Sequence, residues 1–398
     1  MKNPFDNITW NDVLEMLFSE WDVSPDPAAY TSYFTPGRVN LIGEHIDYNG
    51  GLVMPIAVSP GIKGLYRVRE DRTICLFSTT HTKRLSFSLD DIPPKYNTEN
   101  DWCNYPIGVI QSLQKAGLKI QGFDLFFDSN LPEGSGLSSS AAIEVLTAYI
   151  LTHQANRKID LPSLAVKCQK VENEFIGVKC GIMDQFAVAN CKKDHALLLN
   201  CNTLEFEHIP FELDDYSLLV INSRKPRSLI KSAYNERKAE SDEALKQLIR
   251  SGALKEGEYL VDAEMESIGS ITDEKIRKRA RHVISENLRV KHAATSLRVG
   301  DLHTFGRLMN ASHQSMKEDY EITGLEMDTL AETAQNIDGC LGARMTGGGF
   351  GGCAIALVKK NQISAFTEIL SRRYHTVTGR HCEIYACEAN DGVRPLKA

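Results

Sequence analysis

The segment that most restricts the fold of this chain is 131–144, where a glycine-rich turn and three serines run directly into a helix-like stretch. It reads Leu-Pro-Glu-Gly-Ser-Gly-Leu-Ser-Ser-Ser-Ala-Ala-Ile-Glu and follows a β-rich run at 123–127. Glycines let the backbone approach an anion, and a helix start offers free N–H groups. The segment therefore predicts a phosphate-binding loop between a strand and a helix, with a plain serine-capped helix start as the alternative. It lacks the lysine of G-x-x-x-x-G-K-[ST], which excludes a Walker A site.

A second glycine-rich segment, 344–353, reads Arg-Met-Thr-Gly-Gly-Gly-Phe-Gly-Gly-Cys and contains a formal G-x-G-x-x-G at Gly347, Gly349 and Gly352. A dinucleotide-binding fingerprint needs a strand before it and a helix after it, but a β-like run at 353–358 follows here. Only 46 residues remain after Gly352, too few for the rest of such a domain. We therefore expect a glycine turn that closes over a ligand; a simple wide turn is the alternative.

A third segment, 35–51, is apolar enough to be buried and yet carries five polar or ionisable residues: Arg38, Asn40, Glu44, His45 and Asp47. Buried charges are usually paired or functional, because an unpaired one is costly. Two interpretations stay open. The residues form an internal network of arginine and carboxylates, or they line a pocket for a ligand rich in hydroxyl groups, which would satisfy the same donors and acceptors.

Composition and charge exclude several classes of protein. The 398 residues include 24% charged and 42% hydrophobic residues, as in globular proteins, and the length favours two domains. A net charge of −7 gives no general attraction to nucleic acid or to anionic lipid. The densest basic run, 275–281, is interpreted as a solvated helix face. No apolar stretch is long enough to span a membrane.

The compartment is expected to be the cytoplasm. Acidic residues interrupt the first 20 residues, where a signal peptide would be apolar, and the spacing of Val13, Leu14, Leu17, Phe18 and Trp21 predicts an amphipathic helix instead. None of the ten cysteines belongs to a C-x-x-C pair or to a zinc-type grouping. We therefore expect reduced thiols that act as small hydrophobic residues.

The order of the elements predicts an α+β protein. Short β-rich runs and helices alternate in the first half, and long helix-like segments at 228–252, 274–299 and 301–318 dominate the second. The chain ends with a strand, a helix and a final strand at 353–387. An acidic stretch with a proline at 210–215 suggests a division into domains 1–213 and 214–398.

Taken together, the three segments resemble the motifs of the GHMP kinase family, in order and in spacing. The run Gly37-Arg38-Val39-Asn40-Leu41-Ile42-Gly43-Glu44-His45-Ile46-Asp47-Tyr48 is similar to the signature of the branch that phosphorylates galactose. The segments 180–186 (Cys-Gly-Ile-Met-Asp-Gln-Phe) and 319–326 (Asp-Tyr-Glu-Ile-Thr-Gly-Leu-Glu) resemble the catalytic segment and a stretch of the C-terminal lobe in that branch. The resemblance covers nearly the whole chain.

The resemblance implies a two-lobed fold, with an N-terminal α+β lobe, a C-terminal ferredoxin-like lobe and the active site between them. It also implies roles for individual residues. Those around the sugar would be Arg38, Glu44, His45, Asp47, Gly181, Asp184 and Tyr234. Those that bind ATP would be Trp102, Tyr105, Gly134, Ser135, Gly136, Leu137, Ser138, Ser139 and Ser140. The ligands of Mg2+ would be Ser140 and Glu172.

The implied reaction transfers the γ-phosphate of ATP to the anomeric hydroxyl of galactose, giving galactose 1-phosphate and ADP. Positioning and charge neutralisation dominate such a transfer. Asp184 would accept the proton of the attacking hydroxyl, and Arg38 would hold Asp184 ionised and shield developing charge. The expected partners are galactose and ATP, without nucleic acid or membrane, and the expected state is a monomer with at most weak self-association.

Three other functions remain as alternatives. An N-acetylgalactosamine kinase would share most of these residues. A regulatory sensor that binds galactose and ATP without turnover would have a disrupted serine motif, whereas Gly136–Ala141 is complete here. A dehydrogenase is disfavoured by the strand that follows the second glycine segment.

Overall fold

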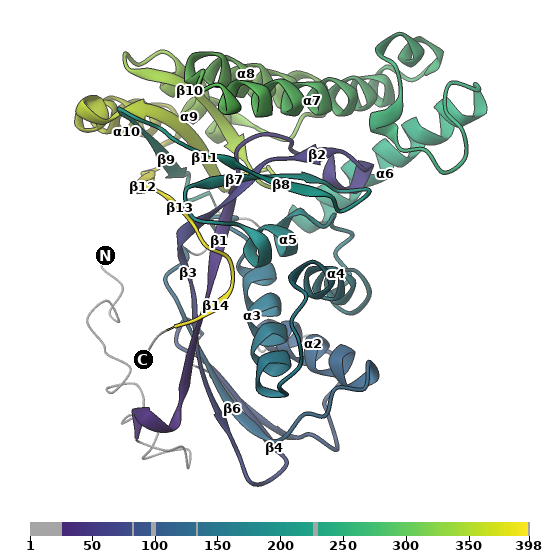
Figure 1. Ribbon diagram of the computed structural model, residues 1–398. Coiled ribbons are helices and arrows are strands. Elements are labelled where there is room, and N and C mark those ends of the chain that lie inside the picture. Colours follow the sequence, from purple (N-terminus) through teal and green to yellow (C-terminus); the bar gives the residue numbers. More distant parts are fainter. Residues whose placement is uncertain (1–25, 82, 97–100, 133, 226–229, 397–398) are drawn as a thin grey trace.

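The computed structural model describes residues 26–81, 83–96, 101–132, 134–225 and 230–396, which form two lobes (Figure 1). The amphipathic helix predicted at 13–21 lies outside the described residues. None of the helices in the described part of the chain has the length and apolar character that a membrane-spanning segment requires.

The first lobe is built on a seven-stranded sheet with the strand order β14-β1-β3-β6-β4-β5, in which β13 also pairs with β3. Neighbouring strands are antiparallel except β4 and β6, which are parallel. The strands are β1 (Thr31–Asn40), β3 (Pro55–Val68), β4 (Thr73–Ser78), β5 (Lys83–Ser88), β6 (Phe123–Ser129), β13 (Ala389–Asn390) and β14 (Arg394–Pro395).

Four helices lie on one side of this sheet: α2 (Asn104–Lys115), α3 (Ser139–Gln154), α4 (Leu161–Val171) and α5 (Met183–Asn190) (Figure 1). Helix α3 is apolar nearly all round and is buried along most of its length, as expected of a helix inside a core. Short turns precede α2 at η3 (Asp101–Cys103) and β1 at η1 (Pro27–Ala29).

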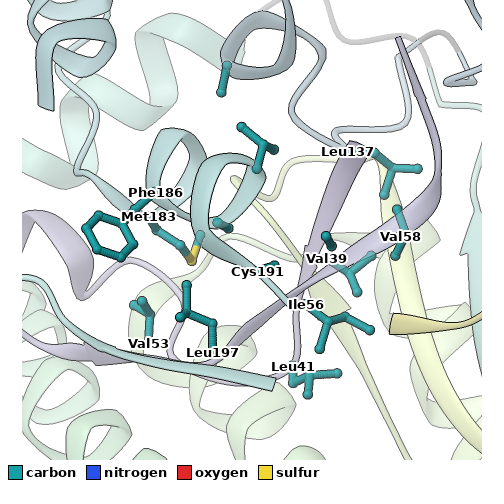
Figure 2. Packing of buried hydrophobic residues seen from close by; sticks show 14 of the residues in the cluster. Val39, Leu41, Val53, Ile56, Val58, Leu137, Met183, Phe186, Cys191 and Leu197 are labelled. Carbon is teal, nitrogen blue, oxygen red and sulfur yellow. The ribbon is translucent and has the colours of Figure 1, made fainter. Parts of the chain in front are cut away.

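The core anchors the helix that carries the predicted catalytic residue. Met183 and Phe186, on either side of Asp184, point into the hydrophobic cluster near Val53 and Leu197, while Val39 and Ile56 come from the neighbouring strands β1 and β3 (Figure 2). Burying side chains of this size contributes about 1.5–3 kcal/mol each. The backbone of Asp184 is therefore fixed by its neighbours, and its carboxylate is left at the surface of a cleft.

The second lobe has a four-stranded antiparallel sheet with the strand order β10-β11-β9-β12. Its strands are β9 (Tyr216–Asn222), β10 (Cys340–Thr346), β11 (Cys353–Lys359) and β12 (Glu383–Cys387). Helices between β9 and β10, and one helix between β11 and β12, complete a ferredoxin-like connection, so that this part of the predicted fold is confirmed.

The helices of the second lobe are long and lie above and beside this sheet (Figure 1). They are α6 (Ile230–Arg250), α7 (Glu274–Arg298), α8 (Leu302–Ser315), α9 (Leu325–Gln335) and α10 (Ile363–Thr378). Short helical turns are η5 (Leu260–Asp262), η6 (Met265–Ser270), η8 (Lys360–Gln362) and η7 (Met316–Tyr320), the last of which has π-helical geometry.

Two features join the lobes. A small sheet of β2 (Leu52–Val53), β7 (His195–Asn200) and β8 (Phe206–Pro210) packs against α7. After β12 the chain returns to the first lobe, where β13 and β14 pair with β3 and β1. The division between 213 and 214 stays a proposal, and the last strands belong to the sheet of the first lobe.

Candidate active site

A cleft of about 630 Å³ opens between the lobes. The first lobe contributes the end of β1, the turn η2 (Asp47–Asn49), α5 and the serine loop, which we define as residues 134–140. The second lobe contributes α6 and the glycine loop, defined as residues 347–352. Fifteen of the residues singled out from the sequence line this one cleft: Arg38, Glu44, His45, Asp47, Tyr105, Gly134, Ser135, Gly136, Ser138, Ser139, Ser140, Glu172, Gly181, Asp184 and Tyr234.

The centre of the cleft is an ion pair between Arg38 and Asp184. Nε of Arg38 donates to Oδ1 of Asp184 at 2.8 Å, and Nη2 donates to Oδ2 at 2.7 Å. The hydroxyl of Ser138 also donates to Oδ2, at 2.5 Å. The Arg38 side chain is almost fully buried, while 29% of the Asp184 side chain is exposed to the cleft. A bidentate guanidinium fixes the orientation of a carboxylate, yet this carboxylate stays open to a substrate.

Asp47 is a second carboxylate in the cleft, and its charge is poorly compensated. Burial, and then the charge of Asp184, raise the pKa of Asp47 to about 7. Its carboxylate lies directly under Gly181, where a Cβ atom would come within 2.1 Å of Oδ2. Position 181 therefore has to be glycine for Asp47 to reach the cleft, which explains the presence of this glycine in the predicted site.

Glu44 takes part in the internal network that the sequence left open. Oε2 of Glu44 pairs with Nη2 of Arg344 at 2.8 Å, and the amide of Asn40 donates to the same oxygen. Oε1 accepts the backbone N–H of Gly347 at 2.7 Å. Both ion-pair side chains are fully buried. The polar residues of 35–51 thus divide between a buried network around Glu44 and the wall of the cleft, where Arg38 and Asp47 lie.

The serine loop places a helix N-terminus at the cleft. Ser138 precedes α3 with a φ of +64°, a left-handed conformation that turns the chain into the helix. The carbonyl of Gly136 accepts Nη1 of Arg38 at 2.7 Å, and the carbonyl of Leu137 accepts the backbone N–H of Arg38 at 3.1 Å. The side chain of Leu137 packs in the hydrophobic core, outside the lining of the cleft.

Beside the serine loop lies a group of carboxylates that includes the predicted metal ligand Glu172. Glu172 begins η4 (Glu172–Ile176), a π-helical turn of the kind found at functional sites. The amide of Gln185 donates to Glu172 at 2.6 Å and to Glu144 at 3.2 Å. Burial, and then the charge of Asp184, raise the pKa of Glu172 to about 7. Burial also raises the pKa of Glu144, whose Oε1 has no partner within the described residues.

These oxygens fit a small divalent cation. Hard cations prefer hydroxyl and carboxylate oxygens, which Ser140 and Glu172 offer at the wall of the cleft. Burial, and then the charge of neighbouring carboxylates, raise the pKa values in this cluster, and a bound cation would stabilise its charged form. Glu144 and Gln185 support Glu172 from the buried side. Glu144 lies in the segment 131–144 and Gln185 in the segment 180–186, but neither sequence pattern predicts this supporting role.

A second cavity of about 540 Å³ adjoins the cleft and shares Tyr105, Gly134, Ser139 and Ser140 with it. Trp102 lines this cavity and stacks on His81, with ring centroids 5.8 Å apart and an angle of 12° between the planes. Nε1 of Trp102 is buried and has no partner within the described residues. Apolar walls with a few polar groups suit a flat heteroaromatic ring.

Several residues of the site were not predicted. Arg344 was quoted only as the start of a glycine segment, and its partner Glu44 lies 300 positions earlier in the chain. Tyr48 and Tyr320 stand only inside longer motifs. The hydroxyl of Tyr48 is hydrogen-bonded to Nδ1 of His45 and to the hydroxyl of Tyr320. A signal was present for two of them, because Arg344 interrupts the apolar run 340–345 and Tyr320 interrupts the acidic run 318–321.

Comparison with known proteins agrees with this geometry. Three family models match: the GHMP kinases N terminal domain at 104–192, the galactokinase galactose-binding signature at 24–67 and the GHMP kinases C terminal domain at 293–376. A galactokinase of Staphylococcus saprophyticus is 46% identical over 388 residues, covering 96% of this chain and 100% of the relative. One of Limosilactobacillus reuteri is 44% identical over 392 residues, covering 97% and 100%.

Solved structures give the same result. The crystal structure of Lactococcus lactis galactokinase complexed with galactose matches with a TM-score of 0.91 and 43% identity, covering 96% of this chain and 99% of that one. A mevalonate kinase matches with a TM-score of 0.62 at 21% identity, covering 90% and 99%, which is a likeness of fold alone.

Proposed function

The chain belongs to the galactokinases of the GHMP kinase family, and on that premise we propose how its cleft moves a phosphoryl group from ATP to galactose. The observation that carries the proposal is the Asp184 carboxylate, held by Arg38 and Ser138 and open to the cleft beside the start of α3. The carboxylate of Asp184 and the N-terminus of α3 thus face the same part of the cleft.

Galactose binds on the side of the cleft formed by Asp47, Gly181 and Tyr234. Carboxylate oxygens accept hydrogen bonds from sugar hydroxyls, and the Tyr234 ring supplies a flat wall beside the glycine loop. The anomeric hydroxyl points toward Asp184. The backbone N–H of Gly347 is already bonded to Glu44, so Glu44 acts on the sugar side chiefly by fixing the glycine loop.

ATP binds across the serine loop. The start of α3 and the glycines of the loop offer backbone N–H groups to the phosphates. The adenine ring enters the adjoining cavity between Tyr105 and Trp102. The two cavities share the serine loop, so this orientation brings the γ-phosphate to the Asp184 end of the cleft.

The transferred proton goes to Asp184. As the sugar oxygen bonds to phosphorus and the bond to ADP breaks, the hydroxyl proton passes to the carboxylate. Arg38 and Ser138 hold this carboxylate toward the attacking hydroxyl, and it accepts the proton late, once the sugar oxygen has begun to bond to phosphorus. The guanidinium also offsets negative charge that develops on the phosphoryl oxygens.

Ser140 and Glu172 would hold Mg2+. When bound, the cation neutralises charge on the phosphates and orients them.

We also propose that the protein is a monomer, since one chain supplies every residue that lines the cleft. We propose the cytoplasm as its compartment, since all ten cysteines are free thiols.

Two measurements test the proposal. ADP release is followed with galactose, N-acetylgalactosamine, glucose, homoserine and mevalonate, and galactose should give the fastest turnover. Asp184→Asn should lower kcat by about 10²- to 10⁴-fold, the usual effect of a positioned base, with an unchanged melting temperature. A loss below about tenfold in a folded variant would remove Asp184 from the role of base.

A further inference from the structure

The glycine loop is held from outside, because it has almost no side chains of its own. Gly347, Gly349, Gly351 and Gly352 all have positive φ values, between 77° and 138°. Glycine loses more conformational entropy than other residues when its backbone is fixed, so contacts from other segments must hold such a loop in place. The second lobe supplies one, since the carbonyl of Ile322 accepts the N–H of Phe350 at 2.7 Å, and two adjacent residues of the first lobe supply two more. Glu44 accepts the N–H of Gly347 at 2.7 Å, and Nε2 of His45 lies 3.2 Å from the carbonyl oxygen of Gly348.

The partner of Nε2 fixes the tautomer of His45. A carbonyl oxygen only accepts, so Nε2 must carry the hydrogen. The His45 side chain is buried, and burial lowers its pKa to about 3, which keeps the ring neutral at physiological pH. Nδ1 is therefore without a hydrogen and must accept one. Its neighbour is the hydroxyl of Tyr48, at 2.7 Å.

The same logic extends through two more residues. Tyr48 gives its hydrogen to His45, so the Tyr48 oxygen accepts from the hydroxyl of Tyr320, at 2.9 Å. Tyr320 is fully buried at the end of the π-helical turn η7, and its oxygen accepts from the hydroxyl of Ser241 on α6, at 2.6 Å. Four hydrogen bonds then run in one direction, from Ser241 through Tyr320, Tyr48 and His45 to Gly348.

We propose that His45 is a positioning residue, which the chain Ser241–Tyr320–Tyr48 orients so that its Nε2–H holds the carbonyl of Gly348 and thereby keeps the glycine loop closed over the cleft. Both ring nitrogens are used within the protein, so neither binds the sugar directly. Gly348 also lies against the ring of Tyr234, with 3.5 Å from a Cβ built at Gly348 to the nearest ring carbon. The chain therefore links α6, which carries Tyr234, to the loop that covers it.

The first test reads the tautomer and does not depend on turnover. In protein labelled with ¹⁵N-histidine, the resonances of His45 are assigned by their loss in His45→Gln. We expect a protonated Nε2 and an unprotonated Nδ1 from pH 6 to pH 8. A hydrogen on Nδ1, or a mixture of tautomers in the wild-type protein, would overturn the proposal whether or not any variant folds.

The second test breaks the chain at Tyr48→Phe and at Tyr320→Phe, which keep both rings. We expect the ¹⁵N resonance of His45 Nδ1 to shift in Tyr48→Phe, because that nitrogen loses its hydrogen-bond donor. In both variants kcat should fall about three- to tenfold, as for the loss of an ordinary hydrogen bond, with the KM for galactose changed less than twofold. Tyr33→Phe is the matched control, because it also removes a buried tyrosine hydroxyl bonded to a histidine ring, here Nδ1 of His153 at 3.0 Å.

The kinetic part of this proposal rests on the proposed function. The possible outcomes distinguish a failure of the positioning role from a failure of that function. If Tyr48→Phe and Tyr320→Phe behave like Tyr33→Phe in kcat, the positioning role is wrong while galactose turnover stands. If the KM for galactose rises and kcat is unchanged, His45 contacts the sugar and the proposal is also wrong. If no sugar is turned over, the tautomer of the wild-type protein still decides the arrangement at His45.

Discussion

The two carboxylates in the cleft, Asp47 and Asp184, differ in their compensation. Asp184 has a bidentate arginine, whereas Asp47 lies under Gly181 and forms no ion pair with any of the residues that the structure describes. The charge on Asp47 therefore destabilises the ligand-free protein. A bound sugar can offset this effect by donating hydrogen bonds to the carboxylate. Stability and binding are opposed at this residue.

We expect Asp47→Asn to stabilise the ligand-free protein at high pH. The folded pKa of Asp47, about 7, is above its ordinary value of 3.8, so its contribution to stability is complete below pH 3.8 and is lost as the pH rises through 7. The variant has no such loss. Between pH 5 and pH 8.5, its free energy of unfolding should gain about 3 kcal/mol on the wild type. Urea unfolding at both pH values measures this, and a constant difference would contradict it.

The sequence predicted most of these site residues because their motifs are local. Arg38, Asp47, Gly181 and Asp184 each occur in a short run with a recognisable pattern. The pairing of Glu44 with Arg344 could not be predicted in the same way, because it depends on how two segments 300 residues apart meet in space. Leu137 shows a different limit of prediction from motifs. Its place in the serine loop predicted a residue that binds ATP, but its side chain packs in the core.

At the scale of elements, the sequence located the start of α3 and the strand β11 within a residue or so, since clear glycine or serine signals precede both. Periodicity does not reveal what packs on the polar face of a helix. The basic run 275–281 on α7 was predicted to be a solvated face, and for Arg279 this is wrong. Arg279 is fully buried, and it donates to Glu240 on α6 at 2.7 Å and to Glu321 at 2.8 Å.

Arg279 should therefore stabilise the packing of α7 on α6. Replacing it by methionine leaves Glu240 buried with Arg237 and Lys275 as its remaining ion-pair partners among the described residues, and should cost about 2–4 kcal/mol of unfolding free energy. Arg298→Met on the same helix is the control, because the Arg298–Glu207 pair is exposed and should cost less than about 1 kcal/mol. Equal losses in urea unfolding of the two variants would contradict the inferred role.

At the scale of the whole molecule, the end of the chain closes on the helix that carries Asp184. After the second lobe, the N–H of Val393 donates to the carbonyl of Val188 at 2.9 Å, and Gly392 donates to Cys191 at 2.8 Å, both at the end of α5. No local signal in the sequence indicates this return, since β13 and β14 are only two residues long. The two lobes are therefore joined by strand pairing as well as by the cleft, and we expect one cooperative unfolding transition in calorimetry.

Gly392→Ala tests this connection with a single methyl group. A Cβ at position 392 would come within 2.3 Å of the carbonyl oxygen of Ala189 on α5, so either the tail or the helix must move. Overpacking of this kind costs about 1–3 kcal/mol, and here the displaced helix holds the proton acceptor, so both the melting temperature and kcat should fall. Gly269→Ala is the matched control, because a Cβ there meets no atom within 4 Å. If Gly392→Ala lost stability but kept full kcat, the tail would hold the lobes together without positioning Asp184, and the connection would be one of stability alone.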